Sequence, residues 1–351
     1  MNPLLLPFSA VFRLGVGLRH AAYRRGWLKT HHLPKPVVSV GNLTVGGTGK
    51  TPLVALVAKF LLSQGWQPGI LTRGYGRKGK GEMIVLPPGS RPRPEEVGDE
   101  PALLALELPQ VPLVVCRSRA RGGRQAEEQF GVDVHILDDG FQHLALARTV
   151  DLVALDATQP LSNWHLLPAG RQREPAGALA RAQMVVLTRT EAATPAAIAA
   201  LEHLIRRLQP AARIFRSSVE LVGWTDGLSG AALPPAGPAG RKAAAFCALG
   251  NARAFFSDLR RWGFDLVEEK TFPDHHYYNQ AELERLAAEG RKRGAEVLLT
   301  SAKDAVKLSA LLPLALPVMA AKIEIAVEPR AEFEAALLGY LRDAKYTERH
   351  E

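Results

Sequence analysis

The architecture of this chain follows from one segment, Pro36-Val-Val-Ser-Val-Gly-Asn-Leu-Thr-Val-Gly-Gly-Thr-Gly-Lys-Thr51. The apolar residues 37–40 predict a buried strand, and the apolar residues 52–62 predict a helix. A glycine-rich turn that ends in Lys50-Thr51 joins them. A strand, such a turn and a helix in this order are the context of a phosphate-binding P-loop, so we expect a nucleotide-binding α/β domain.

Each residue type in this turn suits phosphate binding. The glycines let backbone N–H groups turn toward phosphate oxygens, Lys50 reaches the β- and γ-phosphates, and the Thr51 hydroxyl suits Mg²⁺. The usual pattern starts with Gly where this chain has Thr44. A glycine-rich turn with a surface lysine is the alternative, but strand, turn, Lys-Thr and helix coincide. The predicted nucleotide-binding residues are Thr44, Val45, Gly46, Gly47, Thr48, Gly49, Lys50 and Thr51.

The length and composition of the chain limit the number of domains and the kinds of protein that it can form. With 351 residues and 47% hydrophobic content, the chain can form one large domain or two ordinary ones. Its two cysteines, Cys116 and Cys247, lie in apolar runs. This usage indicates a reducing compartment and argues against a disulfide framework or a cysteine-rich metal site.

Positive charge is concentrated at the N-terminus. Residues 1–81 contain 12 Lys and Arg and no acidic residue, whereas the remaining residues contain 32 basic and 35 acidic side chains. A basic surface of this kind suits anionic lipid or a phosphorylated substrate. Aromatic residues are not interleaved as in nucleic-acid modules, so we expect no nucleic-acid partner.

Residues 1–30 predict a basic amphipathic helix. Arg13 and Arg19 interrupt the apolar runs, which are too short to span a bilayer, and basic residues follow the apolar stretch, unlike in a signal peptide. One face of the helix carries Ser9, Arg13, His20 and Arg24, and another carries Leu4, Phe8, Val11, Leu18 and Ala22. Either the helix lies on an anionic membrane, or it packs against the protein's own core.

Two segments after the P-loop helix have open interpretations. Residues 74–80 form a loop rich in glycine and cations, which suits phosphate or lipid headgroups or is simply solvated. Gly98-Asp-Glu-Pro101 precedes an apolar run. This motif is either a helix cap or the source of a catalytic carboxylate, Asp99.

A predicted strand, residues 132–137, ends in Asp138-Asp139-Gly-Phe-Gln-His143. Carboxylates at a strand end downstream of a P-loop are placed to reach the Mg²⁺ of a nucleotide. Adjacent side chains at a strand end point in different directions, so the two aspartates have different functions. A plain Asp-Gly turn is the alternative.

Predicted strands and helices alternate along most of the chain. This alternation predicts an α/β fold with a P-loop NTPase-like, doubly wound, mostly parallel sheet, and ligands at the carboxyl ends of the strands. We expect a core at residues 31–222, a linker at 223–240 and a smaller α/β domain at 241–351. In the second domain, Asp274-His275 follows a predicted strand and suits acid–base chemistry, although ordinary loop histidines are equally expected.

Together these motifs resemble the tetraacyldisaccharide 4'-kinase family of lipid A biosynthesis. The motifs, in order, are Val40-Gly-Asn-Leu-Thr-Val-Gly-Gly-Thr-Gly-Lys-Thr-Pro52, Arg73-Gly-Tyr-Gly76, Gly98-Asp-Glu-Pro101, Leu137-Asp-Asp-Gly-Phe-Gln-His143, Leu166-Leu-Pro-Ala-Gly170, Arg173-Glu-Pro175, Phe272-Pro-Asp-His275 and Lys303-Asp304. The resemblance extends over nearly the whole chain. Ala302 and Ala252 depart from the family's usual Glu and Pro.

The resemblance implies ATP- and Mg²⁺-dependent phosphorylation of the 4'-hydroxyl of an acylated glucosamine disaccharide 1-phosphate, forming lipid IVA. It also implies a monomer, peripheral or monotopic, at the cytoplasmic face of the inner membrane, with anionic lipid. Asp99 and His275 would be the catalytic pair. Metal contacts would be Thr51, Asp139 and Glu174. The site would be lined by Arg73, Tyr75, Arg119, Asp138, Gln142, His143 and Arg173.

A membrane-associated P-loop NTPase that acts as a switch or assembly factor is the second hypothesis. A GTPase would carry a guanine-reading Asn-Lys-x-Asp, and residues 300–304 do not match that motif. A kinase predicts nucleotide turnover that depends on the lipid acceptor, whereas a switch predicts stimulation by a protein. A non-enzymatic lipid-binding module would leave the P-loop and the aspartates without a function.

Overall fold

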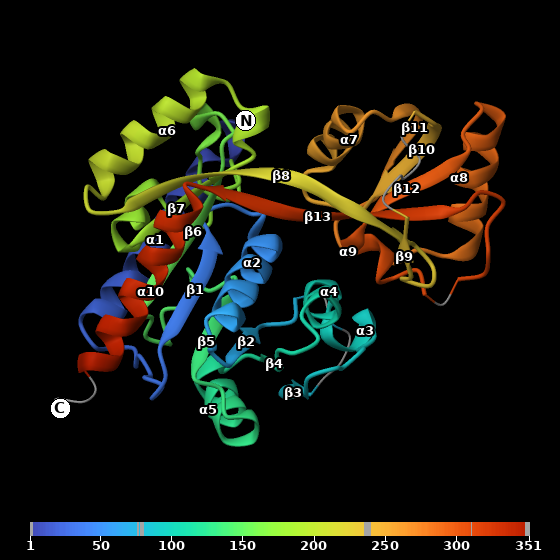
Figure 1. Ribbon diagram of the computed structural model, residues 1–351. Coiled ribbons are helices and arrows are strands. Elements are labelled where there is room, and N and C mark those ends of the chain that lie inside the picture. The colour runs from blue at the N-terminus through green and yellow to red at the C-terminus, as the bar shows by residue number, and fades with distance from the viewer. Residues whose placement is uncertain (1–2, 76, 78–80, 235–239, 310, 348–351) are drawn as a thin grey trace.

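The computed structural model describes residues 3–75, 77, 81–234, 240–309 and 311–347. They form one sheet of 13 strands with helices on both faces (Figure 1). Neighbouring strands follow the order β11-β10-β12-β13-β8-β7-β6-β1-β5-β2-β4-β3, and β9 pairs with β8. The strands are β1 Val37–Asn42, β2 Pro68–Thr72, β3 Met83–Leu86, β4 Leu113–Cys116, β5 Val134–Asp138, β6 Val150–Asp156, β7 Met184–Thr188, β8 Arg213–Asp226, β9 Ala232–Leu233, β10 Lys242–Cys247, β11 Asp265–Thr271, β12 Val297–Ser301 and β13 Val318–Glu328.

Helices connect most of these strands. The α-helices are α1 Leu6–Arg24, α2 Lys50–Ser63, α3 Pro94–Val97, α4 Asp99–Glu107, α5 Arg119–Phe130, α6 Pro195–Leu208, α7 Ala252–Arg261, α8 Gln280–Lys292, α9 Ala302–Ala305 and α10 Arg330–Thr347.

The strands from β7 to β4 form the sheet of a P-loop lobe. Parallel strands occupy its centre, with β1 between β5 and β6. Side chains alternate between the two faces along each strand. Val38 and Val40 pack with α2, α4 and α10, whereas Val153 and Val185 pack with α6 on the opposite face. The predicted doubly wound, mostly parallel α/β fold is therefore confirmed.

Two long antiparallel strands, β8 and β13, run from the P-loop lobe into a second lobe (Figure 1). The start of β8 pairs in parallel with β7, and its remainder pairs with β13. The predicted linker at residues 223–240 therefore begins inside a strand, because β8 continues to Asp226; residues 235–239 lie outside the described part of the chain. One sheet continues through both lobes.

The second lobe repeats the layered arrangement around β10, β11 and β12. Phe255 and Leu259 of α7 pack on one face, and Leu283 and Leu286 of α8 pack on the other. The chain then returns along β13, and α10 packs into the core of the P-loop lobe. Residues 330–347 therefore do not belong to the second lobe, in contrast to the predicted division.

Helix α1 lies on the outside of the P-loop lobe. Its predicted apolar face is exposed, including Phe8 at 62% and Val11 at 71%, whereas Ser9 and His20 face the protein. The helix therefore does pack against the protein, but through its polar face, and the predicted apolar face does not enter the core. None of the helices that the structure describes has the length and hydrophobicity needed to cross a bilayer.

Candidate active site

The P-loop joins β1 to α2 at the centre of the sheet, as the sequence predicts. Gly49, the N-cap of α2, has a φ of +80°, a left-handed conformation that glycine adopts without a steric penalty. The Asn42 amide donates to the Thr48 hydroxyl at 2.6 Å, and the Thr188 hydroxyl donates to the Thr48 carbonyl at 3.0 Å. Contacts from β1 and β7 therefore hold the loop from two sides.

Asp139 lies opposite the P-loop lysine, directly after β5. Lys50 Nζ is 3.4 Å from Asp139 Oδ1, and Arg173 donates to both carboxylate oxygens at 2.7 and 2.8 Å. Burial alone would raise the pKa of Asp139, but the two cations outweigh it and hold this pKa well below its ordinary range. The carboxylate is therefore ionised between two positive charges.

The environment of Asp138 differs from that of Asp139, as expected for adjacent side chains at the end of a strand. The Thr72 hydroxyl donates to Oδ2 at 2.9 Å, while Oδ1 is buried and has no hydrogen-bond partner among the described residues. Burial, reinforced by the charges of Glu100 and Asp139, raises the pKa of Asp138 to about 7. An unpartnered buried carboxylate oxygen beside a P-loop is suited to a cation.

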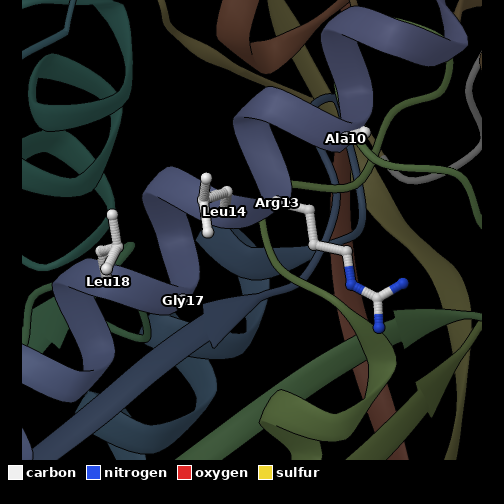
Figure 2. Close-up of a pocket in the computed structure, with 5 residues that line it drawn as sticks. All are labelled: Ala10, Arg13, Leu14, Gly17 and Leu18. Atoms are coloured by element: carbon white, nitrogen blue, oxygen red, sulfur yellow. The ribbon is translucent and has the colours of Figure 1, made fainter.

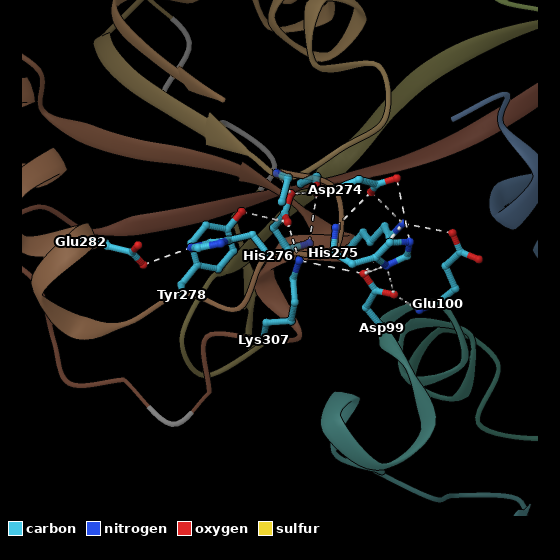
Figure 3. A network of polar contacts seen from close by, with 12 residues as sticks. Asp99, Glu100, Asp274, His275, His276, Tyr278, Glu282 and Lys307 are labelled. Carbon is cyan, nitrogen blue, oxygen red and sulfur yellow. Dashed lines mark hydrogen bonds and ion pairs between the residues drawn. The ribbon is translucent and has the colours of Figure 1, made fainter. Parts of the chain in front are cut away.

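Asp99 and His275 form a hydrogen-bonded pair across the boundary between the lobes (Figure 3). Asp99 begins α4 and is buried, whereas His275 follows β11 in the second lobe. His275 Nδ1 is 2.9 Å from both carboxylate oxygens, so the neutral ring donates from Nδ1 and keeps Nε2 as an acceptor. This hydrogen bond raises the pKa of His275 although burial lowers it.

Two lysines of the second lobe surround Asp99. Lys303 Nζ is 3.8 Å from Asp99 and 3.0 Å from Glu100. Lys307 has a fully buried side chain, 2.8 Å from Asp304 and 3.9 Å from Asp99. Burial would raise the pKa of Asp99, but His275 and both lysines outweigh it and lower this pKa. Asp99 is therefore an ionised carboxylate that joins the lobes.

The Asp99–His275 pair lies close to the P-loop. Gly250, in the turn before α7, packs against Gly46: a Cβ added to Gly250 would lie 2.9 Å from the Gly46 Cα and 3.4 Å from an Asp274 carboxylate oxygen. The same Asp274 oxygen is 3.9 Å from Nε2 of His275. The phosphate-binding turn and the Asp99–His275 pair therefore lie at one site, with Gly250 and Asp274 between them.

Two of the predicted lining residues, Arg73 and Arg119, are positively charged, and their charges affect a third, His143. Arg119 is buried, and its Nε has no hydrogen-bond partner among the described residues. Burial, together with the charges of nearby arginines that include Arg119 and Arg73, lowers the pKa of His143 to about 4. His143 is therefore neutral, and Arg119 places a positive charge near Asp138 and Asp139.

Two other predicted lining residues connect parts of the site. Gln142 donates from Nε2 to the Asn42 carbonyl at 2.9 Å. The Tyr75 ring lies 5.3 Å from the His275 ring, centroid to centroid, and is largely exposed. Tyr75 is the second residue of the predicted basic loop at residues 74–80, most of which lies outside the described residues.

Glu174 is turned toward α1. Its Oε1 lies 3.1 Å from His20 Nε2, and its Oε2 accepts a hydrogen bond from Arg181 at 2.7 Å. Both oxygens are therefore engaged, and the structure does not bring Glu174 together with Lys50 and Asp139. The expected metal contact of Glu174 stays a prediction and would require these bonds to rearrange.

Sequence reasoning assigned no role to Asn42 or to the lysines around Asp99. Asn42 binds both the P-loop and Arg173. A polar residue that ends an apolar strand is a signal that could have identified Asn42. Lys307 follows the short helix α9, and its burial depends on Asp304 and Tyr278 in the second lobe as well as on Asp99, which spacing does not predict.

These features define a class of protein, a P-loop phosphotransferase. The phosphate-binding turn, the lysine that opens α2 and the aspartates at the end of the neighbouring strand are its diagnostic parts.

Comparisons with known proteins specify the family. A family model described as Tetraacyldisaccharide-1-P 4'-kinase matches residues 1–342. A tetraacyldisaccharide 4'-kinase of Geobacter metallireducens is 40% identical over 339 residues, covering 95% of this chain and 96% of the relative. One of Syntrophus aciditrophicus is 38% identical over 351 residues, covering 97% and 93%.

A solved structure agrees with this assignment. The crystal structure of the "apo" form of LpxK from Aquifex aeolicus in complex with ATP matches with a TM-score of 0.74 and 31% identity, covering 96% of this chain and 98% of that one. The chain belongs to the tetraacyldisaccharide 4'-kinase family. This confirms the kinase hypothesis over the NTPase switch.

Proposed function

We propose that this protein transfers the γ-phosphoryl group of ATP to the 4'-hydroxyl of a tetraacylated glucosamine disaccharide 1-phosphate. The names of the relatives state the acceptor and the hydroxyl, and the Aquifex structure contains ATP. The observation that carries the proposal is the Asp99–His275 pair, hydrogen-bonded at 2.9 Å beside the P-loop. A kinase needs a base for the acceptor as well as a phosphate site, and this pair supports the assignment of the base.

His275 is the proposed general base. A sugar hydroxyl is a poor nucleophile at neutral pH, so its proton must leave as the new bond to phosphorus forms. With Nδ1 bonded to Asp99, Nε2 accepts this proton. The hydroxyl oxygen then bonds to the γ-phosphorus, the bond to the bridging oxygen breaks and ADP leaves. The ionised Asp99 stabilises the resulting imidazolium.

Positive side chains stabilise the transferred group. Its charge is spread over the equatorial oxygens in the transition state, so fixed cations contribute most of the catalysis. Lys50 and Arg173 lie at the P-loop and are oriented by Asp139. Arg119 adds a further positive charge near Asp138 and Asp139.

Mg²⁺ fits the donors that are present. Among the described residues no three acidic, His or Cys side chains form a cluster that could hold a metal. Mg²⁺ is normally held by one or two carboxylates together with substrate phosphates. Asp138, with its unpartnered Oδ1, Asp139 and the Thr51 hydroxyl would hold it. When bound, Mg²⁺ neutralises phosphate charge.

We place α1 on the membrane surface. Its exposed side carries large apolar residues with arginines beside them, a combination suited to the interface of an anionic bilayer. The small residues Ala10 and Gly17 leave a hollow flanked by Arg13, Leu14 and Leu18 (Figure 2). Because the donor is ATP, the membrane face that this helix meets is the cytoplasmic face of the inner membrane.

Label transfer tests the proposed function. The purified protein is incubated with γ-labelled ATP, Mg²⁺ and tetraacyldisaccharide 1-phosphate in detergent micelles, and label is followed in lipid and in inorganic phosphate. We expect ATP consumption to require the disaccharide and label to appear in the glycolipid. Equal ATP hydrolysis without lipid, and no labelled glycolipid, would contradict the proposal.

A further inference from the structure

Backbone hydrogen bonds hold residues 171–173 against the first half of the P-loop. The Val45 amide donates to the Arg171 carbonyl at 2.8 Å, and the Arg173 amide donates to the Leu43 carbonyl at 2.7 Å. Between these bonds, Thr44 and Gln172 form an antiparallel bridge. The position of Arg171 is therefore set by backbone pairing and does not depend on its own side chain.

The Arg171 side chain crosses the mouth of the P-loop at Gly46. Gly46 has a φ of +105°, and a Cβ on it would lie 2.1 Å from Arg171 Nη2. A Cβ at this position would displace the end of the guanidinium. Because Gly46 has no Cβ, the Arg171 cation lies directly against the phosphate-binding turn.

The Arg171 guanidinium has no acidic partner among the described residues. Its Nη2 donates to the carbonyl of Gly250, in the second lobe, at 3.1 Å, and the side chain is otherwise exposed. Arg173, two residues on, is by contrast bound to both oxygens of Asp139. Arg171 is thus an exposed cation at a site that suits anions, and among the described residues its side chain hydrogen-bonds to one neutral oxygen.

We propose that Arg171 is a further catalytic residue, an arginine finger within the chain that contacts the γ-phosphoryl group during transfer. The inference rests on the proposed function, because it takes the P-loop as the ATP site. A guanidinium presents a planar fork of donors that matches phosphate oxygens. In other P-loop enzymes, an arginine at the γ-phosphate accelerates transfer by about 10³–10⁵-fold because it stabilises transition-state charge.

The contact with Gly250 couples this finger to the lobe junction. Gly250 also lies beside Asp274, which follows β11: a Cβ on Gly250 would be 3.4 Å from the Asp274 oxygen that lies near His275. In the proposed step, Arg171 releases the Gly250 carbonyl and binds a phosphate oxygen of ATP, close to the Asp99–His275 pair. Arg171 then acts on the phosphoryl donor, and His275 acts on the hydroxyl of the acceptor.

Binding of a transition-state mimic tests the proposal without a lipid acceptor. Calorimetry measures the affinity of the full-length protein for ADP, and for ADP with aluminium fluoride and Mg²⁺. For Arg171→Ala we expect unchanged ADP affinity and at least about a 100-fold loss of the extra affinity for ADP with aluminium fluoride, a fraction of the rate effect of such arginines. Arg171→Lys keeps the charge without the fork and should recover only part of it.

The matched control is Arg261→Ala. Arg261 also binds across the lobe boundary, to the Val219 carbonyl at 3.0 Å and to Glu191 at 3.4 Å, so its partners lie outside the P-loop. We expect this variant to bind the mimic as the wild type does. Wild-type affinity for the mimic in Arg171→Ala, or an equal loss in both variants, would overturn the proposal and leave Arg171 as a tie between lobes. A wild type that binds the mimic but phosphorylates no lipid would instead contradict the proposed acceptor.

Discussion

Replacing Asp99 and His275 singly and together tests whether they act as one unit. General base catalysis contributes about 10²–10⁴-fold, which corresponds to about 2.7–5.4 kcal/mol at about 1.36 kcal/mol per tenfold. We expect His275→Ala to lower kcat by this factor. Asp99 remains held by Lys303 and Lys307, at 3.8 and 3.9 Å, so the lobe contact survives. Asp99→Ala removes the group that orients the base, and the double variant should lose little more than either single variant.

The assay is the initial rate of label transfer to lipid at saturating ATP, together with the ATP affinity of each variant. ATP affinity should be unchanged, because both side chains act on the acceptor. Asp265→Ala, which removes an exposed carboxylate at the start of β11, is the control and should transfer label at the wild-type rate. Losses that multiply in the double variant, or wild-type turnover in either single variant, would refute a shared function.

Three further predictions concern Lys303, the buried Lys307 and the exposed face of α1. The Asp99 hydrogen bond raises the pKa of His275, whereas burial and the charge of Lys303 lower it. Lys303→Met should therefore move the acid limb of the kcat–pH profile to higher pH. A limb that stays in place or moves to lower pH would contradict this. Lys307→Met leaves its buried carboxylate partner without an ammonium and should lower the free energy of unfolding by about 3–5 kcal/mol, measured by urea denaturation. Phe8→Glu should reduce sedimentation with anionic vesicles without changing ATP affinity, and unchanged sedimentation would count against membrane binding.

Local patterns predicted the centre of the molecule correctly. The P-loop and the Asp138-Asp139 strand end follow from short-range rules, because hydrophobic runs, glycine and lysine have defined roles within a few residues. The meeting of Asp99 and His275, 176 positions apart, was expected from the family motifs and occurs at 2.9 Å. Spacing alone could not predict that contact, since it depends on how the lobes pack.

Other features escaped prediction because they arise from tertiary packing. The Gly- and Pro-rich composition after residue 223 suggested a linker, yet β8 and β13 continue the sheet between the lobes since each satisfies the other's backbone. The return of α10 to the P-loop lobe depends on the direction of β13. The helical pattern of α1 predicted its two faces, but not that Ser9 and His20 would face the protein.

The pH dependence of single-turnover transfer, with ATP prebound and lipid added last, reports most directly on the proposed base. For the wild type, we predict a rate that rises with pH through an apparent pKa above the ordinary histidine value of about 6.5, because Asp99 raises the pKa of His275. In His275→Ala this limb should disappear and leave a slow, flat profile. The same limb in that variant would contradict the claim that His275 accepts the proton of the sugar hydroxyl.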